Sequence, residues 1–269
     1  MDPILQEFEQ DLDRINSQLQ LIERLKDFAK QDYSKDVYGA ENEFLDCAIT
    51  VHEVANQVHA GFPMLTGTLL LYLAGRFEEF TRTLFEDLCQ RLVQRARAFN
   101  KLPRKMRDNL VFFTAMVMQS PRKFGHAEGG VRTFLSTLSE NLRGDSPFLR
   151  VNHECLSITE SNMRAEVFSE LFSRVGVSSI WKPIGQQAQM QAYFETLDSG
   201  NAESQAKREL DKLMDLRNKV AHPSGAIEWP STDMVIKYVN YIRILARSLT
   251  DLIGVYEVTL CQSVQDGVE

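Results

Sequence analysis

The eight residues Leu216-Arg217-Asn218-Lys219-Val220-Ala221-His222-Pro223 close a segment with helical periodicity. If residues 206–221 form a helix, Leu210, Leu213 and Met214 fall within about 50° of one line, and Arg217 falls in the middle of that apolar stripe. The ring of Pro223 disfavours the helical conformation for the residue before it, so the helix should end at or just before His222. This stretch therefore predicts a helix with a guanidinium on its apolar face and an imidazole at its end.

The apolar pattern of the rest of the chain is also helical. Residues 65–99 carry one long stripe, and further helices are expected at 41–60, 104–119, 131–142, 163–175, 185–197 and 202–221, with a closing helix after Pro230. Convincing alternation at period two is almost absent. We therefore expect an all-α fold, an antiparallel helical bundle. The stripe of residues 65–99 consists of Leu69, Leu73, Phe77, Phe80, Leu84 and Leu88.

The first 62 residues differ from the rest of the chain and are interpreted as an acidic helical arm, followed by the bundle at 63–260 and a polar tail at 261–269. Residues 1–60 carry a net charge of −8, whereas the whole chain of 269 residues carries −7, so the remaining body is almost neutral. The arm has apolar residues spaced alternately by three and four, as in a heptad seam, which can pack onto the body or pair with a second chain. These residues are Leu5, Phe8, Leu12, Ile15, Leu19 and Ile22.

Seven basic residues follow one another between residues 91 and 107 with no acidic residue among them. Such a concentration of positive charge is suited to the phosphate backbone of RNA, and it is equally typical of a solvated helix end and loop. The residues are Arg91, Arg95, Arg97, Lys101, Arg104, Lys105 and Arg107.

A polar track on the helix at 65–99 offers partners for Arg217. Arg76 and Glu79 can pair with each other across one helical turn. Alternatively, Glu79 or Glu78 faces Arg217, because a guanidinium on a core face needs a counter-charge or an interface with another molecule.

Metal and membrane sites find little support in the sequence. The pairs His52-Glu53 and His153-Glu154 lack the second histidine of a zinc-binding helix, and we expect no metal and no cofactor. The longest apolar run, Leu69 to Ala74, is too short to cross a membrane. The four cysteines are scattered and no signal-peptide pattern leads the chain, which favours a cytoplasmic protein.

The spacing of Arg217, Asn218 and His222 resembles the RxxxxH motif of the HEPN superfamily, the higher eukaryotes and prokaryotes nucleotide-binding domains. From about Met64 to Val258 the chain looks most like the subgroup called RiboL-PSP-HEPN. The resemblance implies a metal-independent endoribonuclease in which two protomers bring their motifs together at a homodimer interface. RNA would be cut to 2′,3′-cyclic phosphate and 5′-hydroxyl ends, with His222 transferring protons, Arg217 stabilising phosphate charge, and Asn218 orienting the histidine or holding a phosphate oxygen.

By the same resemblance the protein is a toxin or an anti-phage defence effector, with an antitoxin or another regulatory protein as a possible partner. Some HEPN domains are not catalytic, so the alternative is an interaction, dimerisation or nucleotide-binding module. In that case Arg217 is a structural arginine paired with a core carboxylate, and His222 caps a carbonyl group at the helix end.

Overall fold

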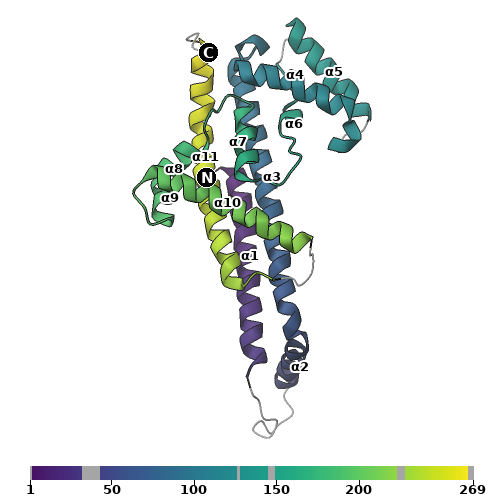
Figure 1. Cartoon of the computed structure of the whole chain (residues 1–269). Helices are drawn as coiled ribbons and strands as arrows, with labels where there is room; N and C mark the ends of the chain where they lie inside the picture. Colours follow the sequence, from purple (N-terminus) through teal and green to yellow (C-terminus); the bar gives the residue numbers. More distant parts are fainter. Residues whose placement is uncertain (1, 32–42, 126–127, 145–148, 223–227, 266–269) are drawn as a thin grey trace.

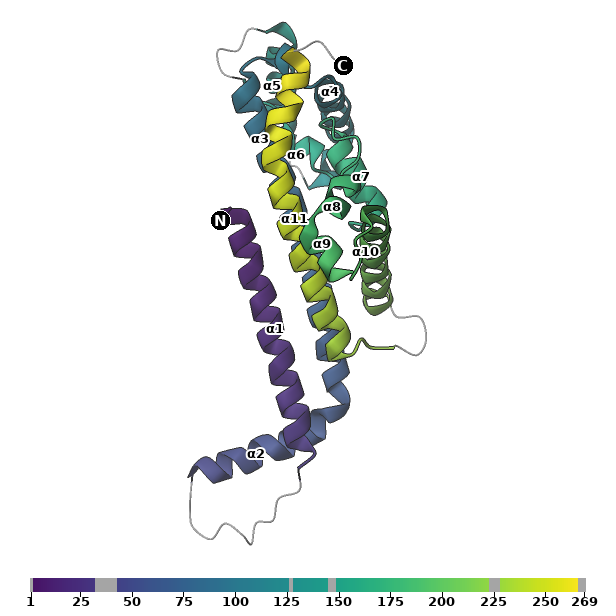
Figure 2. The same ribbon diagram turned by 90° about the vertical axis from the view of Figure 1, so that its left-hand side faces the viewer.

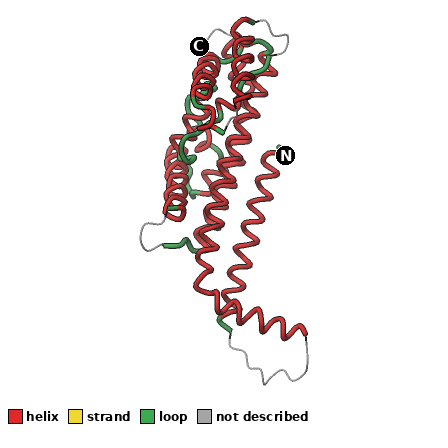
Figure 3. The backbone as a smooth tube through the Cα atoms, turned by 90° about the vertical axis from the view of Figure 1, so that its right-hand side faces the viewer, coloured by secondary structure: helices red, strands yellow, loops and turns green. Residues whose placement is uncertain are grey.

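The protein is a bundle of helices. The computed structural model describes residues 2–31, 43–125, 128–144, 149–222 and 228–265, and these contain no strand (Figures 1 and 3). The expected all-α fold is confirmed. The α-helices are α1 (Pro3–Ala29), α2 (Glu43–Val58), α3 (Phe62–Ala96), α4 (Arg104–Gln119), α5 (Glu128–Arg143), α6 (His153–Leu156), α7 (Ala165–Ser173), α8 (Trp181–Gln186), α9 (Ala188–Tyr193), α10 (Ser199–Ala221) and α11 (Thr232–Gln265); the 3-10 turns are η2 (His59–Gly61), η3 (Phe99–Lys101) and η4 (Pro121–Phe124).

Three long helices, α1, α3 and α11, run side by side along the molecule (Figures 1 and 2). Leu73, Phe77, Phe80, Leu84 and Leu88 of the α3 stripe are buried, and Leu69 packs against the core from a partly buried position. The closing helix contributes Val239, Ile242, Leu245 and Leu249 to the same core. Burial of these apolar faces supplies the main stabilisation of the bundle.

Helix α1 belongs to this core rather than standing apart from it. All six residues of its heptad seam are buried, and the first five share the main core cluster with α3 and α11. The helix begins with Asp2, whose carboxylate accepts a hydrogen bond from the backbone N–H of Ile4 at 2.9 Å, and with Pro3 in its first turn. The sequence left two partners open for the heptad seam, and in the structure the seam packs onto the body of the same chain.

The acidic side chains of α1 meet basic side chains of the body. Asp11 accepts from Arg76 at 2.6 Å, Asp13 from Arg243 at 2.7 Å, and Glu9 from Arg247 at 2.5 Å. Burial alone would lower the pKa of Arg76, but the Asp11 and Glu79 carboxylates outweigh it and raise that pKa above its usual value. Three carboxylates of the arm thus form ion pairs with arginines of the same chain.

The remaining helices lie at one end and along one side of this core. Helices α4, α5 and α6 gather around the C-terminal end of α3, whereas α2 extends from its N-terminal end (Figure 1). The single helix expected at 185–197 is wrong: α8 and α9 are separate, because the backbone of Gln187 is extended and its side-chain amide donates to the Ser248 carbonyl at 2.8 Å. Helix α10 packs against α8 and crosses α3.

One continuous helical stretch, Phe44–Ala96, contains an 18-residue window apolar enough to cross a membrane. A third of that window is buried inside the protein. Core helices of soluble proteins pass the same test, so a single helix of this kind is weak evidence for a membrane span.

Candidate functional site

The end of α10 has the local structure that the sequence predicts. The helix begins at Asp198, whose carboxylate accepts from the backbone N–H groups of Gly200 and Asn201, and its last helical residue is Ala221. His222 leaves the helix with φ −130° and ψ 71°, although its backbone N–H still donates to the Asn218 carbonyl at 2.9 Å. Its imidazole is therefore carried on the first residue beyond the helix, and it is exposed.

Arg217 lies at the edge of the buried stripe of α10. Leu210, Leu213 and Met214 are buried, whereas Arg217 is half-buried. Its Nη1 atom donates to the Asn218 Oδ1 atom at 3.1 Å. No carboxylate of the described residues forms an ion pair with this guanidinium. The positive charge of Arg217 therefore remains available to an anion.

A second asparagine, Asn162, joins this group from the segment before α7. Its Nδ2 atom donates to the Asn218 Oδ1 atom at 2.6 Å, so one oxygen accepts from both Asn162 and Arg217. Within the described part of the chain, the side-chain oxygen of Asn218 thus contacts Arg217 and Asn162, and His222 is reached only through the Asn218 backbone carbonyl. Asn162 belongs to no motif and lies 56 residues away in sequence, so only the fold reveals it.

The segment that carries Asn162 is tied to α10 by two further contacts. The Arg164 Nη2 atom lies 2.5 Å from the Asp215 Oδ1 atom, and the backbone N–H of Ala165 donates to Asp211 Oδ1 at 2.9 Å. These contacts hold the start of α7 against the outer face of α10 and thereby fix the position of Asn162.

The chain beyond the motif returns to α3 through Trp229. An ideal Cβ atom on Gly67 would lie 2.5 Å from Cε3 of Trp229 and 3.2 Å from Cγ1 of Val220. The indole therefore sits directly on the backbone of α3, where only glycine leaves room. Pro223 itself lies outside the described residues.

Of the two interpretations of the polar track on α3, the one in which Glu79 or Glu78 faces Arg217 is wrong. Glu79 pairs with Arg76 at 2.5 Å, as the alternative interpretation expected. Glu78 pairs with Arg82 one turn further along α3. Both carboxylates thus already have cations on their own helix, at positions where contacts within one helical turn are geometrically easier than contacts between helices.

The basic run from 91 to 107 lies far from the motif. Trp229, which follows the motif in the chain, contacts α3 at Gly67, whereas Arg97 lies at the C-terminal end of the same helix. The distance from Gly67 to Arg97 along the helix axis is about 45 Å at 1.5 Å per residue. Arg91 lies 2.6 Å from Asp87 and 3.1 Å from Asp2, and Arg95 lies 3.1 Å from Glu257. The expected phosphate-binding stripe is therefore partly neutralised.

The other members of the run have different surroundings. The Nε atom of Arg107 donates to the Leu102 carbonyl at 3.1 Å, and Arg104 lies 3.8 Å from Asp108. Lys101 and Lys105 are exposed. Arg97 and Arg107 line one pocket, which is taken up below.

The three described histidines outside the motif, His52, His59 and His153, make structural contacts. His52 Nε2 lies 2.8 Å from the Gln31 carbonyl, and the ring of His59 packs edge-on against Phe62. Among the described residues, no group of three or more histidines, cysteines and carboxylates has the arrangement of a metal site. His153 lies 3.4 Å from Glu154 and 3.8 Å from Glu86, on a different part of the molecule from Arg217.

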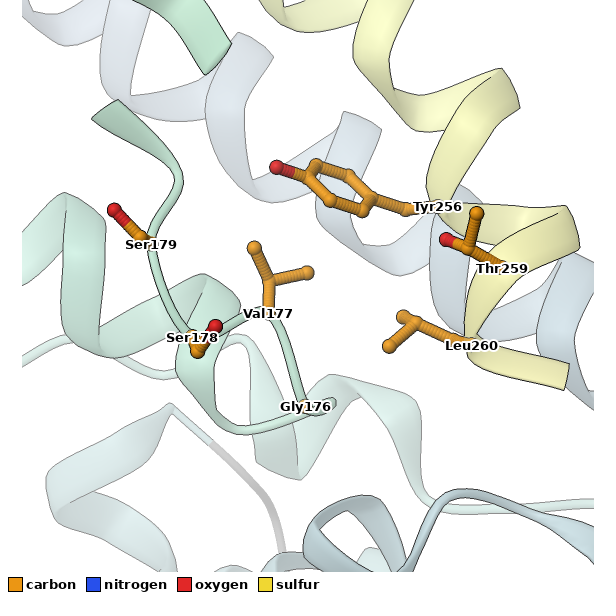
Figure 4. A pocket seen from close by; sticks show the side chains of 7 residues that line it. All are labelled: Gly176, Val177, Ser178, Ser179, Tyr256, Thr259 and Leu260. Atoms are coloured by element: carbon orange, nitrogen blue, oxygen red, sulfur yellow. The ribbon is translucent and has the colours of Figure 1, made fainter. Parts of the chain in front are cut away.

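A small pocket of about 260 Å³ lies between the turn at 176–179 and α11 (Figure 4). Its walls include Val177, Tyr256 and Leu260, with the hydroxyls of Ser178 and Thr259 nearby. Burial raises the pKa of Tyr256 to about 12, so this phenol stays protonated at neutral pH. The pocket has no charged lining residue and does not include the motif.

Comparison with protein families shows to which family the chain belongs. The model described as RiboL-PSP-HEPN matches residues 13–254, which includes most of α1 as well as the bundle. The resemblance therefore begins well before Met64, where the sequence alone suggested its start. No curated protein and no solved structure matches the chain.

Proposed function

The chain belongs to the RiboL-PSP-HEPN family, and from this premise we propose that it is a metal-independent endoribonuclease whose catalytic groups are Arg217 and His222. The observation that carries the proposal is the surroundings of the two motif side chains, Arg217 and His222. Arg217, whose guanidinium has no carboxylate partner among the described residues, precedes the exposed His222 by five residues. A structural arginine would instead be satisfied by a core carboxylate.

The reaction needs only proton transfer and charge stabilisation from the protein. In RNA the 2′-hydroxyl attacks the neighbouring phosphorus, the bond from phosphorus to the 5′-oxygen breaks, and a 2′,3′-cyclic phosphate and a 5′-hydroxyl result. His222 takes the proton from the 2′-hydroxyl or gives one to the leaving 5′-oxygen. Arg217 offers a planar fork to the phosphate oxygens as negative charge builds up on them.

One guanidinium and one imidazole are few groups for this reaction, and a two-fold dimer doubles them. In the proposed homodimer the ends of two α10 helices meet, so one His222 acts as base and the other as acid. The partial exposure of Arg217 and the exposure of His222 support this arrangement, because both residues are accessible to a second protomer.

The proposed biological setting follows from the family. We propose a cytoplasmic toxin or anti-phage defence effector that is controlled by an antitoxin or another regulatory protein. A nuclease that acts on cellular RNA needs such control.

The experiment is RNA cleavage by the purified protein in the presence of EDTA. We expect cleavage to products with cyclic phosphate ends, and we expect His222→Ala and Arg217→Ala to abolish it while the dimer persists. Lys219→Ala is the matched control, since Lys219 is an exposed cation between the two motif residues and should leave cleavage intact. RNA with a 2′-deoxy sugar at the cleavage position should not be cleaved, because it lacks the attacking 2′-hydroxyl.

Two outcomes would contradict the proposal. Cleavage that survives in both motif variants would show that the activity resides elsewhere. If the RNA stays intact and the protein instead forms a stable complex with another protein, the alternative of a non-catalytic binding module is favoured.

A further inference from the structure

A second basic site lies at the far end of α3 from the motif. A pocket of about 490 Å³ opens between the C-terminal end of α3, the start of α4 and the end of α5. Three arginines from these three segments, Arg97, Arg107 and Arg143, contribute to its lining. Its volume falls in the range of small-molecule sites.

The charge around this pocket favours an anion. Arg97 and Arg143 form no ion pair with a described residue. One carboxylate, Glu140, also lines the pocket, and it accepts from the Ser136 hydroxyl at 2.9 Å. Among the lining residues that the structure describes, three guanidiniums stand against one carboxylate, and Arg97 and Arg143 carry the charge that has no ion-pair partner in that part of the chain. The planar guanidinium fork matches the oxygens of a phosphate group.

The backbone of Arg97 gives independent support for a ligand. Arg97 ends α3 with φ 59°, in the left-handed conformation, and its N–H donates to the Val93 carbonyl at 3.0 Å. Glycine is the usual residue at such a helix end, because side chains with a Cβ atom are strained there. Strained residues are concentrated at functional sites. An arginine that keeps this conformation places its side chain at the pocket.

The polar surroundings of the pocket point to a polynucleotide strand. Phe99 is a lining residue whose side chain also packs against the core, and the part of its ring left uncovered is aromatic surface for a base. Lys101 and Lys105 are exposed and follow the lining segment 97–100 in the chain, so they add positive charge next to it. A chain of phosphates can use the pocket and this surface together, whereas a free nucleotide uses only the pocket.

We propose that this pocket binds a phosphate of single-stranded RNA at a position remote from the cleaved bond. The inference rests on the proposed ribonuclease function and adds a substrate requirement to it. The pocket and the motif are separated by about 45 Å along α3, which corresponds to about 13 nucleotides at a stacked rise of 3.4 Å. Long RNA occupies both sites of one protomer, and short oligonucleotides occupy only one.

Binding in the His222→Ala background separates this inference from catalysis, because it requires no cleavage. The probes are fluorescein-labelled single-stranded RNAs of about 30 and about 6 nucleotides, followed by fluorescence anisotropy. The variant is Arg97→Gly with Arg143→Ala. Arg97→Gly removes the guanidinium where glycine suits the backbone, so thermal unfolding should occur no earlier than in the parent.

Arg132→Ala is the matched control, since Arg132 is an exposed arginine on α5 that does not line the pocket. We expect the double variant to bind the long RNA about tenfold more weakly than the parent. The slope of log affinity against log salt concentration should decrease in magnitude by about 1.4, because each lost phosphate contact to a single strand removes about 0.7 and two contacts are lost. The control should bind as the parent does.

Three results would overturn the proposal. The first is unchanged affinity and salt slope for the long RNA in the double variant. The second is an equal loss in Arg132→Ala, which would show a general charge effect. The third is adenosine monophosphate binding as tightly as the long RNA in an Arg97-dependent way, which would identify a free nucleotide as the ligand. If binding follows the expectation but the wild-type protein cleaves no RNA, only the proposed function fails.

Discussion

The contact between Gly67 and Trp229 determines how the chain after the motif sits on α3, and Gly67→Ala tests it. A Cβ atom at this position would lie 2.5 Å and 2.7 Å from two carbon atoms of the indole. Gly75 lies two turns further along the same helix, and a Cβ atom there meets nothing within 4 Å. Gly75→Ala is therefore the matched control, with the same chemical change on the same helix.

The two substitutions should have opposite effects on stability. Replacement of an exposed helical glycine by alanine stabilises a protein by about 0.5–1 kcal/mol, which is the expectation for Gly75→Ala. At Gly67 the same gain is opposed by the displacement of Trp229, and insertion of a methyl group into a packed contact costs about 1–3 kcal/mol. Gly67→Ala should therefore be less stable than Gly75→Ala by about 1–3 kcal/mol.

Thermal unfolding and tryptophan fluorescence measure the two parts of this effect. For a chain of this size, each kcal/mol shifts the midpoint of unfolding by about 2–4 °C. The protein has two tryptophans, of which Trp181 is buried far from the substitution and Trp229 is half-buried. A change in emission of Gly67→Ala, absent in Gly75→Ala, therefore reports movement of Trp229.

The reasoning is refuted if both variants are equally stable and both keep the parent emission spectrum. That result would mean that the indole does not rest on the backbone of α3. Since Trp229 follows the motif closely in sequence, we also expect Gly67→Ala to lower RNA cleavage more than Gly75→Ala does.

Two further predictions concern stability. Burial alone would raise the pKa of Glu209, but hydrogen bonds from Lys237 and Lys212 outweigh it and hold that pKa below its usual value. The folded protein then binds fewer protons at this carboxyl than the unfolded chain does, so the contribution is complete at neutral pH and is lost as the pH falls below the usual carboxyl pKa and through the lowered pKa of the folded state. Glu209→Gln should cost about 1 kcal/mol in urea unfolding at pH 7, and this cost should decrease steadily as the pH is lowered into the acid range; a cost that does not change with pH contradicts this. Leu12→Ala should cost about 2–5 kcal/mol in a single cooperative transition of the whole protein, because Leu12 is fully buried in the main core; a separate early transition of α1 in circular dichroism argues against a shared core.

Much of this protein follows from local sequence rules. The helical periods predicted the all-α fold, and the pattern of α3 identified its buried face. The stop at His222 also follows from sequence, because proline constrains the residue before it whatever the tertiary fold. The RxxxxH spacing and the surrounding residues were enough to indicate the family that the match over 13–254 shows.

Other properties depend on which helices meet, and sequence patterns predicted these properties wrongly or not at all. The heptad seam of α1 was compatible with a second chain, and only the positions of α3 and α11 decide that it packs within the chain. Glu79 and Glu78 were suitable partners for Arg217 by charge alone, yet each pairs with an arginine on its own helix, since short-range pairs cost less conformational entropy. Asn162 reaches Asn218 only because α7 is docked on α10.

Most of the helices, their buried faces and the residues of the motif can be predicted from the amino-acid sequence, because backbone conformation and amphipathic pattern are properties of neighbouring residues; the break between α8 and α9 is an exception. Only the tertiary structure decided which polar groups surround Arg217, that the basic run lies at the opposite end of α3, and that Arg97, Arg107 and Arg143 share one pocket. These are contacts between residues far apart in the chain, and a periodic pattern carries no information about which helix faces which.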